Sequence, residues 1–218
     1  IDLKTLSSIK SSMRKIKDQE FLSSNIQKSF IKLLTSKYNL SSILKKLKQL
    51  GLLKKLIPEF GEIEGQIQFD TFHSYSVDEH TFKVVRNMRQ MFINKVDQNL
   101  KVECELIRRL SKIEILYLAG IFHDLGKGKG GDHSKIGIKI FKKFALRSKM
   151  NKSDSFLISW LIENHLFMSS VAQRMDVYDL KTVKNFTKTV DTVEKLDYLY
   201  LLTINDIRAV SYTHLTLP

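Results

Sequence analysis

The sequence predicts an all-α fold, and two observations carry that prediction. Of the 218 residues only two are proline and 43% are hydrophobic, as in a globular domain rather than a disordered chain. Apolar residues also recur at three- and four-residue spacings over long segments, which is the period of helices that bury one face. A chain of this length can bury one sizeable core, with room for a smaller appendage. We therefore expect a helical bundle preceded by a helical lead-in.

Residues 1–58 are the expected lead-in, with helices over 21–38 and 40–57. Ser41 and Ser42 suit a helix start, Gly51 a break, and Pro58 an end. Residues 1–60 hold 13 Lys or Arg against 4 Asp or Glu, within a net charge of +13 for the chain. A basic surface can bind nucleic acid, but arginine is the usual reader of phosphates and bases, and lysine dominates here. We expect a solvated lysine-rich surface and no nucleic-acid partner.

The segment from 59 to 110 carries one candidate ligand. Residues 59–77 lack the helical period and predict an ordered loop, whereas a strong helix is expected from Val77. His80 lies one turn inside that helix, near its apolar face. A lone histidine there is more often a hydrogen-bonded core residue than a ligand. Residues 93–110 predict a helix and a loop.

The most informative stretch lies at the end of an apolar run, Ile115–Phe122. The run stops at His123 and Asp124, and four glycines follow within residues 126–131. A buried helix thus delivers an imidazole and a carboxylate side by side before a flexible turn. Such a pair suits a hard or borderline divalent metal. A lone His-Asp dipeptide is more often a polar helix terminus, but the apolar run before this pair places it at the edge of a core and favours the metal site. A second acidic-His pair, at 132–133, opens the next segment.

Four further helices are expected, over 134–146, 155–168, 183–190 and 191–210, with a turn at 151–154 capped by Ser153 or Asp154. Polar residues interrupt two of these otherwise apolar helices. His165 is one, and Asp206 is the other. A carboxylate buried in this way is costly unless it is paired or binds a cation.

We take six polar residues as candidate metal ligands, five of which lie on or just after segments that read as core: His80, His123, Asp124, His133, His165 and Asp206. Distant helices would each supply one or two of them, which is how a helical bundle builds a metal site.

Five motifs resemble those of one family: VDEHT at 77–81, FHDLGK at 122–127, GGDHS at 130–134, ENHL at 163–166 and LLTINDIRA at 201–209. They are similar to the HD superfamily of metal-dependent phosphohydrolases, and in particular to the HD domain of bifunctional PII uridylyltransferase/uridylyl-removing enzymes. The likeness covers about residues 60–210. It implies hydrolysis of the uridylyl-tyrosine phosphodiester on the PII signalling protein, with release of UMP. That family's nucleotidyltransferase domain and glutamine-sensing repeats have no counterpart in these residues.

The resemblance also implies roles for the six candidates. His80, His123, Asp124 and Asp206 would hold a first ion. His133 and His165 would hold a second, with Asp124 bridging the two. Mixed imidazole and carboxylate ligands suit Mn²⁺ or Mg²⁺, with Fe²⁺ as a further candidate. A divalent ion can lower the pKa of bound water to about 7 and neutralise phosphate charge.

Asp124 and Lys127 are the expected catalytic residues, with Lys127 contacting the phosphate. A solvated turn lysine would explain Lys127 equally well. Two other functions stay open: an HD enzyme acting on a free or cyclic nucleotide, and a metal-free helical docking module that uses the basic surface of residues 1–60.

We expect an HD domain over 59–210, and we expect residues 211–218 to be a non-native tail, since they resemble a translated adapter read-through. The first residue is Ile, which suggests a fragment. Cys104 is the single cysteine, so no disulfide can form within the chain. Because no stretch approaches the ~20 apolar residues of a membrane span, we expect a cytoplasmic protein without a membrane partner.

Overall fold

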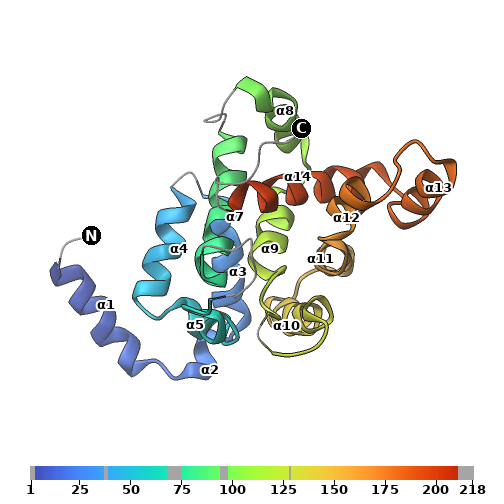
Figure 1. The fold of residues 1–218 in the computed structure, drawn as a ribbon. Coiled ribbons are helices and arrows are strands. Elements are labelled where there is room, and N and C mark those ends of the chain that lie inside the picture. Colours follow the sequence, from blue (N-terminus) through green and yellow to red (C-terminus); the bar gives the residue numbers. More distant parts are fainter. Residues whose placement is uncertain (1–2, 37–38, 68–74, 94–97, 128, 211–218) are drawn as a thin grey trace.

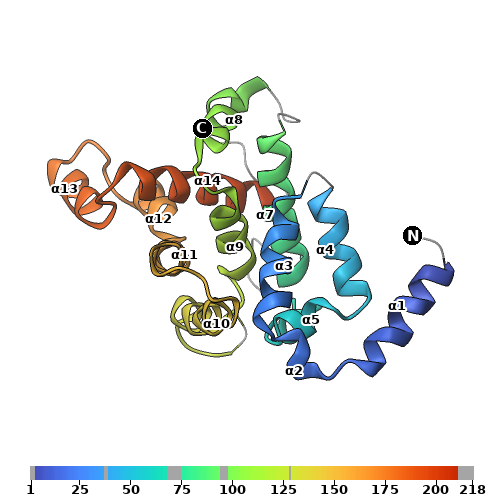
Figure 2. The same ribbon diagram turned by 180° about the vertical axis from the view of Figure 1, so that it is seen from behind.

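The computed structural model describes residues 3–36, 39–67, 75–93, 98–127 and 129–210, and these ranges form an all-α fold (Figure 1, Figure 2). Within them the only β pairing is an isolated antiparallel bridge between Ile67 and Ser76. The predicted fold class is therefore confirmed. The helices are α1 (Leu3–Lys15), α2 (Asp18–Phe21), α3 (Ser24–Leu34), α4 (Leu40–Gln49), α5 (Leu53–Leu56), α6 (Phe60–Ile63), α7 (Val77–Phe92), the 3-10 turn η1 (Gln98–Leu100), α8 (Lys101–Arg109), α9 (Ile113–Phe122), α10 (His133–Ser148), α11 (Lys152–Asn164), α12 (Phe167–Arg174), α13 (Leu180–Thr189) and α14 (Val193–Ala209).

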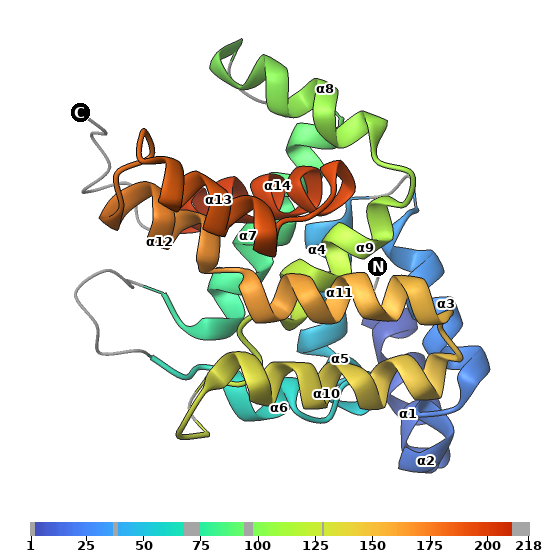
Figure 3. The same cartoon turned by 90° about the vertical axis from the view of Figure 1, so that its right-hand side faces the viewer.

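Helix α9 forms the centre of the bundle, because every residue from Ile115 to Phe122 is buried. A helix that is apolar on all sides needs neighbours all round. Helices α7, α10, α11 and α14 supply them, since each contacts α9. Figure 3 shows α14, α11 and α10 stacked one above another on one side of the molecule. The end of α9, where the His-Asp pair lies, is consequently shielded, and His123 is fully buried.

Two helices begin at caps other than those that the sequence suggested. The side chain of Asn39 accepts the main-chain N–H of Ser42, so Asn39, rather than Ser41 or Ser42, caps α4, which begins at Leu40. The side chain of Asn151 accepts the N–H of Asp154, which places Ser153 and Asp154 inside α11. Asparagine in extended backbone can pair an N–H that the helix itself leaves without an acceptor. Both predicted caps were wrong by two or three residues for this reason.

The predicted helix over 155–168 is also wrong, because it is broken in two. Helix α11 ends at Asn164, His165 follows in the cap position, and α12 begins at Phe167. An apolar spacing can continue across so short a break, so periodicity alone does not mark it. Residues 59–77 contain the short helix α6 where a loop was expected, and α13 begins at Leu180, ahead of the expected residue 183.

The lead-in packs on the core from α3 onward. Phe30 of α3 meets Phe144 of α10 edge to face, with ring centroids 6.1 Å apart. The buried side chain of Gln27 donates to the carbonyls of Phe21 and Leu56, which ties α3 to α2 and α5. Helix α4 lies along α7. Between α4 and α5, Gly51 has a φ of +71°, a left-handed conformation that suits the predicted break.

Candidate metal centre

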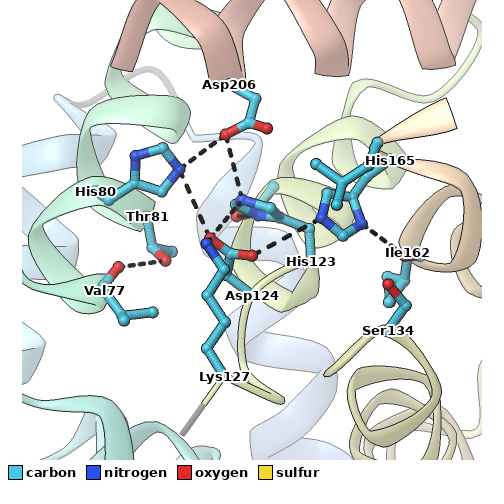
Figure 4. Close-up of polar contacts among 12 residues, drawn as sticks. Val77, His80, Thr81, His123, Asp124, Lys127, Ser134, Ile162, His165 and Asp206 are labelled. Carbon is cyan, nitrogen blue, oxygen red and sulfur yellow. Dashed lines mark hydrogen bonds and ion pairs between the residues drawn. The ribbon is translucent and has the colours of Figure 1, made fainter. Parts of the chain in front are cut away.

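Helices α7, α9, α11 and α14 bring polar side chains together beside the end of α9 (Figure 4). They form two groups, in each of which one potential ligand atom per residue lies within 4.8 Å of the others: His80, His123 and Asp206 in the first, and Asp124, His133 and His165 in the second. The structure therefore brings together all six residues that the sequence proposed as ligands.

The same local arrangement presents two of the histidines. His123 directly follows α9 and His165 directly follows α11. Each ring Nδ1 lies 2.9 Å from a carbonyl oxygen three residues earlier in its own helix, that of Gly120 and of Ile162 respectively. The last carbonyls of a helix lack main-chain partners, and a carbonyl can only accept. Nδ1 must therefore donate in both residues, which leaves Nε2 of the neutral ring as a free ligand atom aimed at the site.

The spacing of the first group matches that of ligands around one ion. Nε2 of His123 lies 3.5 Å from Oδ1 of Asp206, and Nε2 of His80 lies 2.8 Å from the same oxygen. Two ligands bonded at about 2.1 Å to one metal are about 3.0 Å apart in octahedral and about 3.4 Å apart in tetrahedral geometry. Small movements would thus admit an ion. Asp206 keeps 19% of its side chain exposed, so the group lies at the edge of the core.

Asp124 lies between the two groups. Its Oδ2 is 3.3 Å from Nε2 of His123 and 3.8 Å from Nε2 of His80. Its Oδ1 is 3.8 Å from Nε2 of His165. One carboxylate oxygen therefore faces each group, which is the position that a bridging ligand requires. The geometry is compatible with the expected sharing of Asp124 between two ions.

The imidazoles form a continuous row across this centre. Neighbouring ring centroids are 5.6 Å apart from His80 to His123, 5.3 Å from His123 to His165, and 5.4 Å from His165 to His133. His133 is the first residue of α10, where the side chain of Asp132 caps the helix by accepting the N–H of Ser134. In this second acidic-His pair, Asp132 therefore caps α10 and His133 joins the row of imidazoles.

Several buried polar atoms at this centre are available to a bound group. Nε2 of His123, Oδ1 of Asp124 and Nε2 of His133 are buried and make no hydrogen bond to any residue in the described ranges. Buried polar groups are nearly always paired, and an unpaired one destabilises the fold. Two nitrogen lone pairs and an anionic oxygen are the donors that a divalent cation takes. The residues present therefore fit a metal ion.

The charges in the site perturb several pKa values. Burial opposes the protonation of His123, but the carboxylates of Asp124 and Asp206 outweigh burial and raise the pKa of His123 to about 10. Burial also opposes ionisation of both acids, yet the histidines hold the pKa of each below its usual range. Burial and the charge of His123 lower the pKa of His165 to about 4. A proton on His123 therefore supplies the positive charge that offsets Asp124 and Asp206. A bound cation would supply that charge instead.

Lys127 lies at this centre, in the turn that follows Asp124. Its Nζ is 2.8 Å from Oδ2 of Asp124, and 15% of its side chain is exposed. Figure 4 shows the lysine reaching up to Asp124 from the turn. In the same turn the Nζ of Lys129 pairs with Glu62 of α6. The ammonium of Lys127 is thus held at the centre rather than solvated on the turn.

Two features of the site were not predicted. The backbone of α10 passes so close to Gly126 that a Cβ there would lie 2.0 Å from the carbonyl oxygen of His133. The sequence marks this glycine as part of a turn but gives no sign of the contact. The helix-end bonds to Gly120 and Ile162 were missed as well, although a histidine directly after an apolar run is a signal for them.

Cys104 is buried, and burial raises the pKa of its thiol, as expected of a structural cysteine.

Comparison with known proteins places the chain. Residues 77–200 match the HD domain family model. The chain is 40% identical over 199 residues to the bifunctional uridylyltransferase/uridylyl-removing enzyme of Nitrosococcus oceani, covering 91% of this chain and 22% of the relative. It is 41% identical over 184 residues to the enzymes of the same description from Azotobacter vinelandii and Pseudomonas fluorescens, covering 84% of this chain and 20% of each relative. The chain thus spans about a fifth of the length of these curated relatives.

Among the described residues, no helix combines the length and apolar character needed to cross a bilayer. The family match contains five of the six candidate ligands and ends shortly before Asp206, which α14 brings to the same place. With the resemblance of the motifs, the match and the clustered ligands agree. The chain belongs to the HD domain family, a superfamily of metal-dependent phosphohydrolases.

Proposed function

We propose that this chain removes the uridylyl group from uridylylated PII signalling protein by metal-dependent phosphodiester hydrolysis, releasing UMP. The observation that carries the chemistry is the set of buried ligand atoms around Asp124 that lack protein partners. The substrate is inferred from the relatives, which are described as uridylyl-removing enzymes. We propose Mn²⁺ or Mg²⁺ as the ion, with Fe²⁺ as a further candidate, in one or two sites.

The side chains have distinct roles in this proposal. His80, His123 and Asp206 would hold one ion, His133 and His165 would hold the other, and Asp124 would be shared between the two. When bound, a divalent cation supplies an acidified water and offsets the charge of the phosphate. In the reaction a water oxygen bonds to phosphorus, the bond from phosphorus to the tyrosine oxygen breaks, and that oxygen takes up a proton.

Lys127 and Asp124 would assist the same step. The ammonium of Lys127 is 2.8 Å from Asp124 at a partly exposed position, so it can turn to an incoming phosphate oxygen without crossing the core. Charge-assisted hydrogen bonds to phosphate are among the stronger contacts that a protein makes. Asp124 fixes the position of the two ligand groups relative to each other, because each of its carboxylate oxygens faces one group.

The test is hydrolysis of uridylylated PII by the purified chain with Mn²⁺, measured as released UMP. We expect UMP from the wild-type chain and none from Asp124→Asn, which keeps the size of the side chain but removes its charge. Asp191→Asn is the matched control, since Asp191 is exposed and pairs only with nearby Lys195 in the described structure. Full activity of Asp124→Asn would refute the proposed site.

Two further experiments distinguish the other two candidate functions. A panel of free and cyclic nucleotides identifies an HD hydrolase of small substrates if these are cleaved and uridylylated PII is not. Metal analysis identifies a docking module, since a chain with no bound metal and no stabilisation by added Mn²⁺ would favour a non-catalytic role.

A further inference from the structure

The first turn of α7 carries His80, and the side of that turn that faces away from the ligands contacts α4 of the lead-in. The carboxylate of Asp78 is fully buried and accepts the main-chain N–H of Gly65 at 3.0 Å. Its other oxygen accepts from Nζ of Lys48, which lies on α4. Figure 1 shows α4 beside α7, and the two helices are in contact. A buried anion in this turn thus has its counter-charge on a different segment of the chain.

Asp78 and His80 are two positions apart in the same turn, so their side chains leave the helix about 200° apart. His80 points to the ligands in Figure 4, and Asp78 therefore points away from them, toward α4. The side chain of Ser76, which precedes α7, makes no capping bond to the helix. The turn that presents His80 is also held by the carbonyl of Gln66, which accepts the N–H of Val77 at 3.0 Å, and by the pairs of Glu79 with lysines of α4. The contacts of Asp78 differ from the pairs of Glu79 because the Asp78 carboxylate is fully buried.

Both Lys45 and Lys48 pair with Glu79, Lys48 at 3.7 Å, but Lys48 also pairs with the buried Asp78. Lys45 pairs at 3.2 Å with Glu79, and both side chains are more than a third exposed. Lys48 reaches the buried Asp78 and keeps only 27% of its side chain exposed. An exposed pair adds little to stability, whereas removing one partner of a buried pair leaves a charge without compensation. Loss of Lys48 should therefore move the turn, and loss of Lys45 should not.

We propose that Lys48 is a positioning residue for the metal ligand His80, acting through Asp78, so that the lead-in helix α4 is part of the metal centre's support. This rests on the metal site of the proposed function. Metal–ligand bonds tolerate errors of about 0.2 Å, so a small shift of the first turn of α7 weakens the site. Helix α4 lies outside the family match at 77–200 and before the expected domain start at residue 59.

The test measures the dissociation constant of Mn²⁺ by calorimetric titration of the full chain, well below the melting temperature of every variant. We expect Lys48→Met to weaken Mn²⁺ binding about 10-fold, the lower end of the effect of residues that orient ligands. Lys48→Arg should restore most of the affinity. Lys45→Met, which removes the same charge from the same helix, should bind Mn²⁺ like the wild type.

General destabilisation is separated by Ile107→Val, which removes one methylene from a fully buried side chain of α8, a helix that carries none of the candidate ligands. That variant should melt earlier with unchanged Mn²⁺ affinity. Wild-type affinity in Lys48→Met, or equal weakening in Lys45→Met or Ile107→Val, would overturn the positioning role. Absence of Mn²⁺ binding by the wild-type chain would instead overturn the proposed function.

Discussion

Replacing Gly126 by alanine should damage the second ligand group although no ligand residue is replaced. Gly126 lies in the turn after Asp124, and its backbone is not in the left-handed region, so alanine brings no conformational strain of its own. The added Cβ would lie 2.0 Å from the carbonyl oxygen of His133 and 3.0 Å from the nitrogen of Gly137. Both atoms belong to the backbone of α10, which cannot turn aside as a flexible side chain can.

The size of the effect follows from these distances. Real Cβ atoms essentially never approach closer than 3.0 Å, so the turn and α10 must separate by about 1 Å. Forcing extra volume into a packed site costs about 1–3 kcal/mol, which for a chain of this size lowers the melting temperature by about 2–12 °C. His133 is the first residue of α10 and moves with it. A shift of about 1 Å exceeds the ~0.2 Å tolerance of metal–ligand bonds several-fold.

Calorimetric titration with Mn²⁺ and thermal denaturation check both parts. We expect binding that depends on His133 and His165 to weaken at least about 10-fold, while the group of His80, His123 and Asp206 retains its ion. Gly61→Ala is the control, since its Cβ would meet only the side chain of Lys54, at 3.2 Å. Unchanged Mn²⁺ binding and melting in Gly126→Ala would refute the reasoning.

Three further predictions concern stability. Phe144→Ala should lower the free energy of unfolding by about 3–5 kcal/mol, because the Phe144 ring is fully buried and its centroid lies 5.1 Å from that of Phe122. Chemical denaturation measures this free energy, and a loss below about 1 kcal/mol would contradict the prediction. Mn²⁺ at about 100 times its dissociation constant should stabilise the chain by about 2.7 kcal/mol, and EDTA should reverse this, whereas a melting temperature insensitive to both would argue against a metal site. In the metal-free chain the pKa of His123 is raised to about 10, so its protonated form stabilises the fold fully below about pH 6.5, and that contribution is lost as the pH rises through about 10. The melting temperature of the EDTA-treated chain should therefore fall over this range, and a His123→Asn variant should lack that contribution.

The identity of the six candidate ligands could be read from the sequence for a physical reason. Each polar residue interrupts or ends an apolar segment, and a polar group in such a place needs a partner. Asp206 is the clearest case, because it follows a long apolar stretch of α14 and lies beside His80 in the structure. The helical period likewise gave the all-α class, since it depends only on which residues are buried.

The sequence prediction failed at two kinds of feature. Some depend on contacts between residues distant in the chain, and others are helix breaks too short to interrupt the apolar period. The break at His165 divides two apolar helices whose spacing continues across it. The start of α4 depends on a single hydrogen bond that the N–H of Ser42 donates to the side chain of Asn39. A period of 3.6 residues reports which face of a helix is apolar, and it does not report where the helix ends to within a turn.

The sequence by itself determined the fold class and the kinds of ligand, because both follow from local patterns of burial and polarity. Only the tertiary structure decided that Asp124 faces both groups, that Gly126 leaves room for α10, and that Lys48 of the lead-in compensates Asp78 behind His80. These features depend on how separate helices lie against one another. A one-dimensional pattern shows that a side chain must be buried, but packing alone selects what it is buried against.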